Sequence, residues 1–319
     1  MTLLGHDEAW REWRAALGQG RMHHGWILAG RRGMGKAAFA AAAARELLAA
    51  GGSVWSDPRN HPDSLGLEPL PDSDDDERKR AEGKPFKAKR NISVDQVRAL
   101  QKRLHTRPTL GERRAVIVDA ADDLEKGAAN ALLKSLEEPP TGTFFLLVAH
   151  RPGRLQATIR SRCRMLRFPQ LDDAAVGRVL DAETTSLSAE ARAAALAVAG
   201  GSPGAALDFA DRGLTGAYGL MVRIMAGGDA DFGLRGALLG EIGQRPDREQ
   251  QLAVIEAARM IMVNAVPGAS RWRAARMIEA HGQLARLLAQ APTANFEPTT
   301  LMLQIGGLLA SVAADREAA

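Results

Sequence analysis

The chain has 319 residues, 45% hydrophobic and 25% charged, which is typical of a globular protein with room for two or three domains. Its 42 basic and 38 acidic residues leave a formal charge of +4, which permits approach to a polyanion without identifying a nucleic-acid-binding protein. The single cysteine, Cys163, excludes an internal disulfide and a zinc site of several thiolates, so we expect an intracellular, cytoplasmic protein without structural zinc.

Short apolar runs alternate with helical patterns over the first 169 residues, which predicts an α/β domain with a parallel sheet. The expected strands are residues 25–29, 114–119, 144–149 and 164–168. Helices are expected over residues 37–50, from Ser93 to the residues before Pro108, and over 127–138. Residues 51–90 lose the apolar period and change from acidic to basic, so we expect a flexible insertion there.

From Leu171 onwards the pattern is that of amphipathic helices only. Residues 171 to about 213 form a small helical unit, with a break at 200–204. Two apolar stripes at helical spacing follow, which predict helix-on-helix packing; they consist of Leu252, Ile255, Met262 and Val266, and of Leu301, Ile305, Leu308 and Val312. No run approaches 18 strongly apolar residues and no signal peptide is recognisable, so neither export nor membrane insertion is expected.

A glycine-rich segment, Gly30-Arg31-Arg32-Gly33-Met34-Gly35-Lys36, has the spacing of a phosphate loop and lies between a predicted strand and a predicted helix. Backbone N–H groups at such a helix start converge on phosphate oxygens, and Lys36 would reach the terminal phosphates. Position 37 is alanine, which lacks the hydroxyl that normally binds Mg²⁺. Two interpretations stay open: a loop of weakened function, and a loop that still binds nucleotide.

The strand at 114–119 ends in a carboxylate, Asp119, where an active ATPase places a metal-binding aspartate. The next residue is Ala120, so no base is in place for hydrolysis. Asp122 and Asp123 are expected to cap a helix rather than to catalyse. The loss of a metal ligand and of a catalytic base together predicts a degenerate ATPase domain.

Two further segments resemble the clamp-loader branch of the AAA+ ATPases: residues 128–140, AANALLKSLEEPP, and residues 158–163, TIRSRC. Residues 21–26, RMHHGW, and 201–207, GSPGAAL, are similar to the delta prime family of bacterial DNA polymerase III subunits rather than to the ATP-hydrolysing tau/gamma subunits. The resemblance covers about residues 3–210.

This resemblance implies a AAA+ P-loop parallel-sheet domain at residues 1–169, a helical lid at 170–213 and an all-α collar domain at 214–319. It implies a non-hydrolysing delta prime subunit of the polymerase III clamp loader, with tau/gamma and delta subunits as partners, and the β sliding clamp and primed DNA bound through the complex. No intrinsic activity is expected, although the assembly as a whole is a DNA-directed DNA polymerase, a nucleotidyltransferase. No cofactor is required, with weak or vestigial ATP binding at Gly30, Gly33, Gly35 and Lys36.

In the clamp-loader family, the arginine of the Ser-Arg-Cys motif points at the nucleotide of the neighbouring subunit, and this role falls here to Arg162. The resemblance thus implies an arginine finger acting in trans, flanked by Ser161, which orients the turn, and Cys163, a small buried residue. A surface salt bridge is the alternative for Arg162. Gly204 stands where the motor subunits carry a sensor arginine.

Many delta prime subunits carry four cysteines of a zinc module after the first helix, but residues 51–90 here contain none. Asp57 and His61 are expected to be solvated loop residues, so no metal site is predicted. Two other functions stay open. An active P-loop AAA+ ATPase, as a motor subunit or remodeller, would hydrolyse ATP alone, and a stand-alone DNA-binding regulator would bind DNA without partners.

Overall fold

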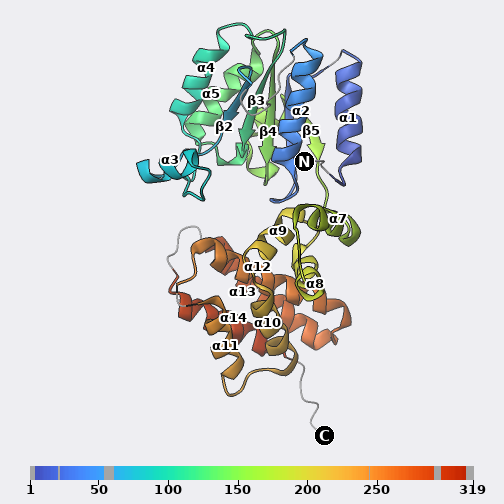
Figure 1. Cartoon of the computed structure of the whole chain (residues 1–319), viewed down its shortest axis with the longest axis vertical. Helices are drawn as coiled ribbons and strands as arrows, with labels where there is room; N and C mark the ends of the chain where they lie inside the picture. Colours follow the sequence, from blue (N-terminus) through green and yellow to red (C-terminus); the bar gives the residue numbers. More distant parts are fainter. Residues whose placement is uncertain (1–3, 21, 54–60, 244, 291–295, 314–319) are drawn as a thin grey trace. The chain divides into compact units, whose positions relative to one another are not determined.

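The computed structural model describes residues 4–20, 22–53, 61–243, 245–290 and 296–313. The chain divides into two compact units, residues 1–170 and residues 171–319. Unit 1 carries the sheet, and unit 2 is helical (Figure 1).

Five parallel strands form the centre of unit 1: β1 (Gly25–Ala29), β2 (Ser64–Leu67), β3 (Arg114–Asp119), β4 (Thr143–Ala149) and β5 (Arg164–Arg167). Their order across the sheet is β2-β3-β4-β1-β5. Because all five run in one direction, their carboxyl ends share one edge and their amino ends share the other. The ends of β3, β4 and β1 are therefore neighbours at the carboxyl edge.

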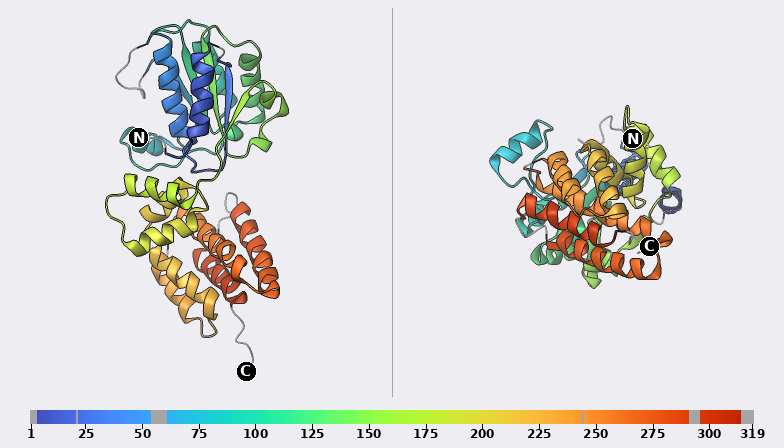
Figure 2. Two further views of the ribbon diagram at one scale, coloured as in Figure 1. Left: turned by 90° about the vertical axis from the view of Figure 1, so that its right-hand side faces the viewer. Right: turned by 90° about the horizontal axis from the view of Figure 1, so that it is seen from below.

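Helices cover both faces of this sheet, as Figures 1 and 2 show. They are α1 (Asp7–Gly18), α2 (Lys36–Ala50), α4 (Val94–Leu104) and α5 (Lys126–Glu137). Unit 1 also contains two shorter helices, α3 (Asp74–Ala81) and α6 (Ala157–Arg160), and α3 projects away from the sheet. Side chains of β1 alternate between the faces. Ile27 packs into the core formed with α4 and α5, whereas the Trp26 ring meets that of Trp13 on α1 with centroids 5.5 Å apart. Because helices cover both faces, all five residues of β1 are buried, and the strand is apolar throughout.

The predicted strands and helices of unit 1 are confirmed with shifts of one or two residues at most of their ends. Ser93 begins α4 through a capping box with Gln96, as its position in the sequence predicted. The expectation of a flexible insertion over 51–90 is wrong at Ser64–Leu67, which form β2 and pair with β3. Only two of these four residues are fully buried, because β2 is an edge strand, and so short a stretch carries no readable apolar period.

Unit 2 contains eight helices among its described residues: α7 (Asp173–Glu183), α8 (Ala189–Ala199), α9 (Pro203–Asp211), α10 (Thr215–Gly227), α11 (Gly233–Ile242), α12 (Arg248–Ala265), α13 (Arg271–Gln290) and α14 (Pro298–Ser311). One hydrophobic core runs from Val176 on α7 to Val312 after α14. The boundary predicted near residue 213 lies within this core, so the lid and collar domains stay predictions. Among the described helices, none combines the length and the apolar character needed to cross a lipid bilayer.

Candidate functional site

The glycine-rich loop joins the end of β1 to the start of α2, as predicted. Gly33 and Gly35 have φ angles of 79° and 73°, which side chains other than glycine rarely adopt. A Cβ on Gly30 would lie 2.5 Å from the Phe168 carbonyl oxygen, so glycine is required there by close packing. The backbone of this loop is therefore shaped as a phosphate loop, with its N–H groups at the positive end of α2.

Lys36 is 2% exposed, and its Nζ donates a hydrogen bond to the Arg31 carbonyl oxygen at 2.6 Å. Burial lowers the pKa of this lysine to about 8, while Asp119 and Asp122 act in the opposite direction. The amine is thus folded back onto its own loop. To reach a phosphate it has to leave the Arg31 carbonyl.

Replacing this lysine by methionine is expected to stabilise unit 1 by about 1–2 kcal/mol at pH 7. The folded pKa of about 8 lies below the ordinary lysine pKa of 10.5, so the cost of burying the charge is complete below pH 8 and disappears between pH 8 and about 10.5. Urea unfolding at pH 7 and pH 10, with the exposed Lys134→Met as control, measures this. An equal gain for Lys36→Met at both pH values would contradict it.

The carboxylates of Asp119, the last residue of β3, and of Asp122 in the turn after it interact with this amine. Burial raises the pKa of Asp119 and that of Asp123. Asp122 accepts hydrogen bonds from the backbone N–H groups of His150 and Arg151 at 2.9 and 3.0 Å. The predicted capping role of Asp122 is therefore wrong: its carboxylate ties the turn after β3 to the end of β4 instead.

His150 is a site residue that no motif in the sequence marks. It follows β4, whose end lies between those of β3 and β1. Its Nδ1 is buried without a hydrogen-bond partner among the described residues, and burial, reinforced by Lys36, lowers the pKa of this histidine to about 4. The available signal was its position directly after an apolar strand of a parallel sheet, where side chains reach the carboxyl edge.

These residues fit the phosphates of a nucleotide better than its metal ion. The loop offers backbone donors and a lysine, but Ala37 and Ala120 supply neither a hydroxyl nor a carboxylate. The described residues also contain no group of three or more His, Cys, Asp or Glu side chains arranged to hold a metal ion.

The Ser-Arg-Cys motif forms the turn between α6 and β5. Nη2 of Arg162 lies 2.7 Å from Oε1 of Glu137 at the end of α5, and Nη1 donates to the Thr158 carbonyl oxygen at 3.0 Å. The Ser161 hydroxyl donates to the same carbonyl oxygen, also at 3.0 Å. The turn therefore holds the arginine against the end of α5.

This turn lies at the amino edge of the sheet, opposite the phosphate loop. In the register of β1 and β5, Trp26 pairs with Arg164 and Ala29 with Arg167, so the whole of β5 separates Arg162 from Gly30. At about 3.3 Å per residue, this separation is at least about 10 Å along the strands. Arg162 is therefore at the far end of the strands from the chain's own phosphate loop.

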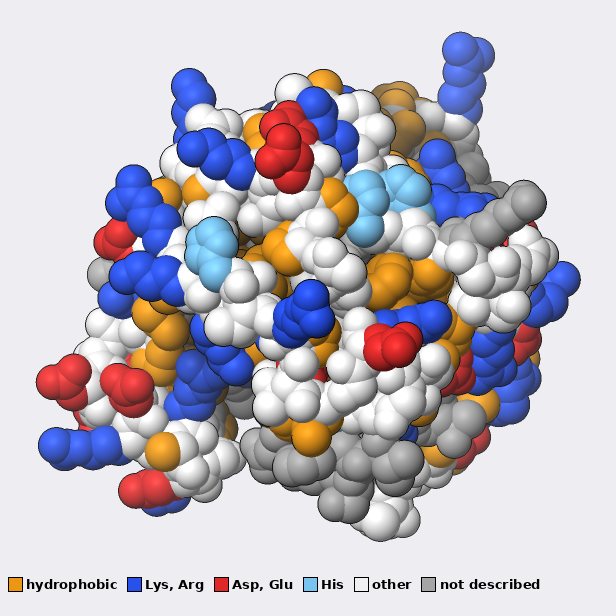
Figure 3. All heavy atoms as spheres, turned by 90° about the horizontal axis from the view of Figure 1, so that it is seen from above, with side chains coloured by type: hydrophobic (Ala, Val, Ile, Leu, Met, Phe, Trp, Pro, Cys, Tyr) orange, Lys and Arg blue, Asp and Glu red, His pale blue; other side chains and the backbone are white. Residues whose placement is uncertain are grey.

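Figure 3 shows unit 1 from above; Lys and Arg side chains are spread over this end, with histidines among them.

Cys163 is half-buried, and burial raises the pKa of its thiol to about 12. We expect the native chain to react with an aromatic disulfide reagent at pH 8 at least tenfold more slowly than the urea-unfolded chain, because the thiolate is the reactive form. Release of the coloured thiol measures both rates. Equal rates would show that this sulfur is an accessible thiolate.

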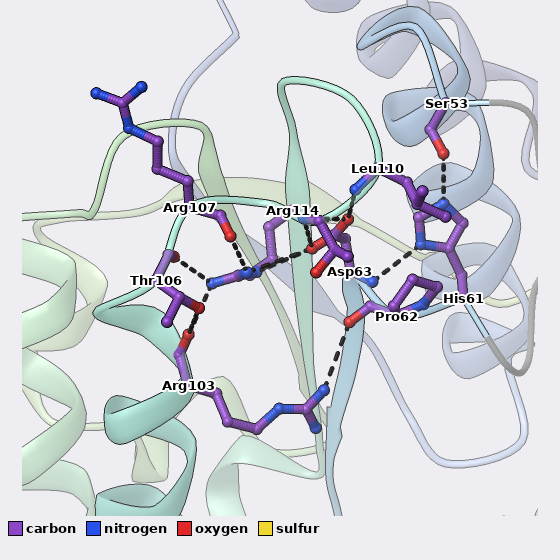
Figure 4. Close-up of polar contacts among 10 residues, drawn as sticks. Ser53, His61, Pro62, Asp63, Arg103, Thr106, Arg107, Leu110 and Arg114 are labelled. Carbon is purple, nitrogen blue, oxygen red and sulfur yellow. Dashed lines mark hydrogen bonds and ion pairs between the residues drawn. The ribbon is translucent and has the colours of Figure 1, made fainter.

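A second polar cluster is buried at the amino edge of the sheet, where β2 and β3 begin (Figure 4). Asp63 accepts hydrogen bonds from the N–H groups of Thr109 and Leu110 and pairs with Arg114, whose Nη2 lies 3.3 Å from Oδ1. Arg114 also donates to three carbonyl oxygens, those of Arg103, Thr106 and Arg107. The pair therefore fixes the loop between α4 and β3 onto the start of β2.

His61 belongs to this cluster and is 5% exposed, so the expectation of a solvated histidine is wrong. Its Nδ1 accepts from the Asp63 N–H at 3.0 Å, so in the neutral ring Nε2 carries the proton and donates to the Ser53 oxygen 2.6 Å away. A histidine that donates to serine cannot take its proton, and this arrangement is structural rather than nucleophilic. Asp57 and Arg21 lie outside the described residues.

A family model described as "DNA polymerase III, delta subunit" matches residues 5–172, which is more than half of the chain. The chain belongs to this family. Subunit delta' of DNA polymerase III from Escherichia coli K12 is a relative at 35% identity over 204 residues, which cover 60% of this chain and 56% of that protein. Subunit tau from the same organism is 26% identical over 322 residues, 98% of this chain and 43% of the relative. The chain thus spans little more than half the length of its delta' relative.

Among solved structures, a DNA polymerase III gamma-subunit-related protein from Thermotoga maritima aligns with 93% of this chain and 98% of its own, at a TM-score of 0.54 and 16% identity. This likeness concerns the fold alone. It confirms the predicted fold class: an α/β domain with a parallel sheet, followed by a helical region.

Proposed function

We propose that this chain is a non-hydrolysing delta prime subunit of the DNA polymerase III clamp loader. In this role it supports ATP-driven loading of the β sliding clamp onto primed DNA during replication. Membership of the delta-subunit family and the similarity to delta' and tau subunits support the proposal. Ala37 on α2 lacks the hydroxyl that binds a metal ion, and Ala120 after β3 lacks the catalytic carboxylate; both support the lack of hydrolysis.

The observation that carries the proposal is the placement of Arg162 at the sheet edge opposite the phosphate loop. A guanidinium there can reach only a nucleotide held by another molecule. Beside a γ-phosphate it would neutralise the charge that develops during phosphoryl transfer. The chain would thus serve as an arginine finger in trans while leaving hydrolysis to a tau/gamma neighbour.

The proposed partners are the tau/gamma and delta subunits, with the clamp and primed DNA contacted through the complex. DNA synthesis belongs to the polymerase assembly, and this chain contributes no active site of its own. It requires no cofactor. The loop at Gly30–Lys36 would bind ATP weakly, because the backbone donors are present while Lys36 is turned back onto Arg31.

Hydrolysis assays on the isolated chain and on a reconstituted loader test this proposal. We expect no turnover by the chain alone, and loss of DNA- and clamp-stimulated hydrolysis when the chain is omitted from the loader. Turnover by the isolated chain that Lys36→Ala abolishes would instead support the alternative function, an active P-loop AAA+ ATPase. The left-handed glycines of the loop, which keep its phosphate-binding shape, are the observation that favours this alternative.

A further inference from the structure

Glu137 is the one acidic side chain that touches Arg162 among the described residues. It is the last residue of α5, and its Oε1 lies 2.7 Å from Nη2 of the arginine. The other terminal nitrogen, Nη1, is bound to the Thr158 carbonyl oxygen. Each terminal nitrogen of the guanidinium therefore already has an acceptor within the chain.

We propose that Glu137 acts as a latch on Arg162 and sets the nucleotide concentration at which the arginine engages a neighbouring site. This inference rests on the proposed function of Arg162 as a finger in trans. Arginine binds phosphate best through two parallel N–H groups, so capture of a γ-phosphate requires exchange of the carboxylate for a phosphate oxygen. Glu137 is thus a positioning residue: it acts through Arg162 and does not touch the nucleotide.

The latch is weak enough to open. The side chains of Arg162 and Glu137 are 35% and 46% exposed, and ion pairs between such partly solvated groups contribute little to stability. A γ-phosphate carries more negative charge than a carboxylate and competes successfully for the same nitrogens. While it binds, the Glu137 carboxylate beside it repels it, so the latch also weakens the engaged state.

Removal of this carboxylate leaves the end of α5 in place. The carbonyl oxygen of Leu136 is held by Nε2 of His24 at 2.9 Å, and the Glu138 N–H donates to the Lys134 carbonyl oxygen. Neither bond uses the Glu137 side chain. Glu138 is the matched control, since it is adjacent and exposed and forms no ion pair in the described part of the chain.

The test measures the ATP dependence of DNA- and clamp-stimulated hydrolysis by the reconstituted loader. We expect Glu137→Gln to lower the KM for ATP two- to fivefold with kcat changed less than twofold, and Glu138→Gln to change neither. A two- to fivefold change corresponds to about 0.4–1 kcal/mol, the range for an exposed ion pair, at 1.4 kcal/mol per tenfold. An unchanged or raised KM for Glu137→Gln would overturn the latch.

A second comparison separates the latch from a general effect on the subunit. In a chain that already carries Arg162→Ala, the change Glu137→Gln is expected to have no further effect on KM, and a persisting effect would overturn the proposal. Assembly of the loader is checked by size-exclusion chromatography. If the Glu137→Gln chain does not co-elute with the loader while the Glu138→Gln chain does, the proposal is also overturned. If Arg162→Ala leaves ATP hydrolysis by the loader unchanged, Arg162 is not an arginine finger and the proposed function is wrong. If Arg162→Ala lowers hydrolysis but Glu137→Gln leaves the KM for ATP unchanged, Arg162 is an arginine finger and only the proposed role of Glu137 is wrong.

Discussion

Replacing Arg114 by methionine is expected to lower the free energy of unfolding of unit 1 by about 3–5 kcal/mol. The side chains of Arg114 and Asp63 are 4% and 0% exposed, so water cannot compensate either partner when the other is removed. The substitution leaves a buried carboxylate without its cation and three carbonyl oxygens without their donor. Methionine fills a similar volume, which keeps the loss electrostatic rather than a cavity effect.

Urea unfolding followed by tryptophan fluorescence measures this loss, because four of the five tryptophans lie within residues 1–170. The control is Lys79→Met, which breaks the exposed pair with Asp75 on α3 and is expected to leave the free energy of unfolding almost unchanged. A cost for Arg114→Met as small as that of the control would show that the buried pair contributes nothing to unit 1.

The substitution Arg162→Ala is expected to reduce ATP hydrolysis at the one neighbouring site by about 10³-fold or more, the range for arginine fingers in general. The steady-state rate of ATP hydrolysis by the loader then equals the sum of the rates at its other nucleotide sites. Alanine removes the guanidinium without disturbing the Ser161 bond to Thr158, so the turn itself is retained. Arg162→Lys is expected to rescue only part of the rate, since a single ammonium cannot replace the planar fork.

Arg160→Ala is the matched control, because Arg160 is an exposed arginine two residues away on α6. Single-turnover hydrolysis by the assembled loader, with primed DNA and clamp present, separates the slow site from the others. Normal assembly with a slow phase only in Arg162→Ala supports the finger. If Arg162→Ala and Arg160→Ala behave alike, Arg162 forms a surface salt bridge and nothing more.

Much of unit 1 could be predicted from the sequence, because its signals are local. The apolar runs at 114–119 and 144–149, the Ser93 cap and the glycine spacing of 30–36 each lie within a few residues. The short edge strand β2 gave no such signal, and neither did His61, whose burial depends on Ser53 and Asp63 being brought to it by the fold. His150 was missed for the same reason: its neighbours at the carboxyl edge come from other strands.

The fold class of this protein, the position of its phosphate loop and the absence of a hydroxyl at position 37 and of a carboxylate at position 120 follow from the amino-acid sequence. Which side chains meet depends on how the chain folds. The parallel register of β1 and β5 places Arg162 at the edge opposite Gly30, and α5 ends where Glu137 can bind that arginine. Likewise, Asp122 binds the end of β4, and Asp63 pairs with Arg114. These contacts join residues 25 to 51 positions apart, and a distance of that length along the chain is closed only when the sheet forms.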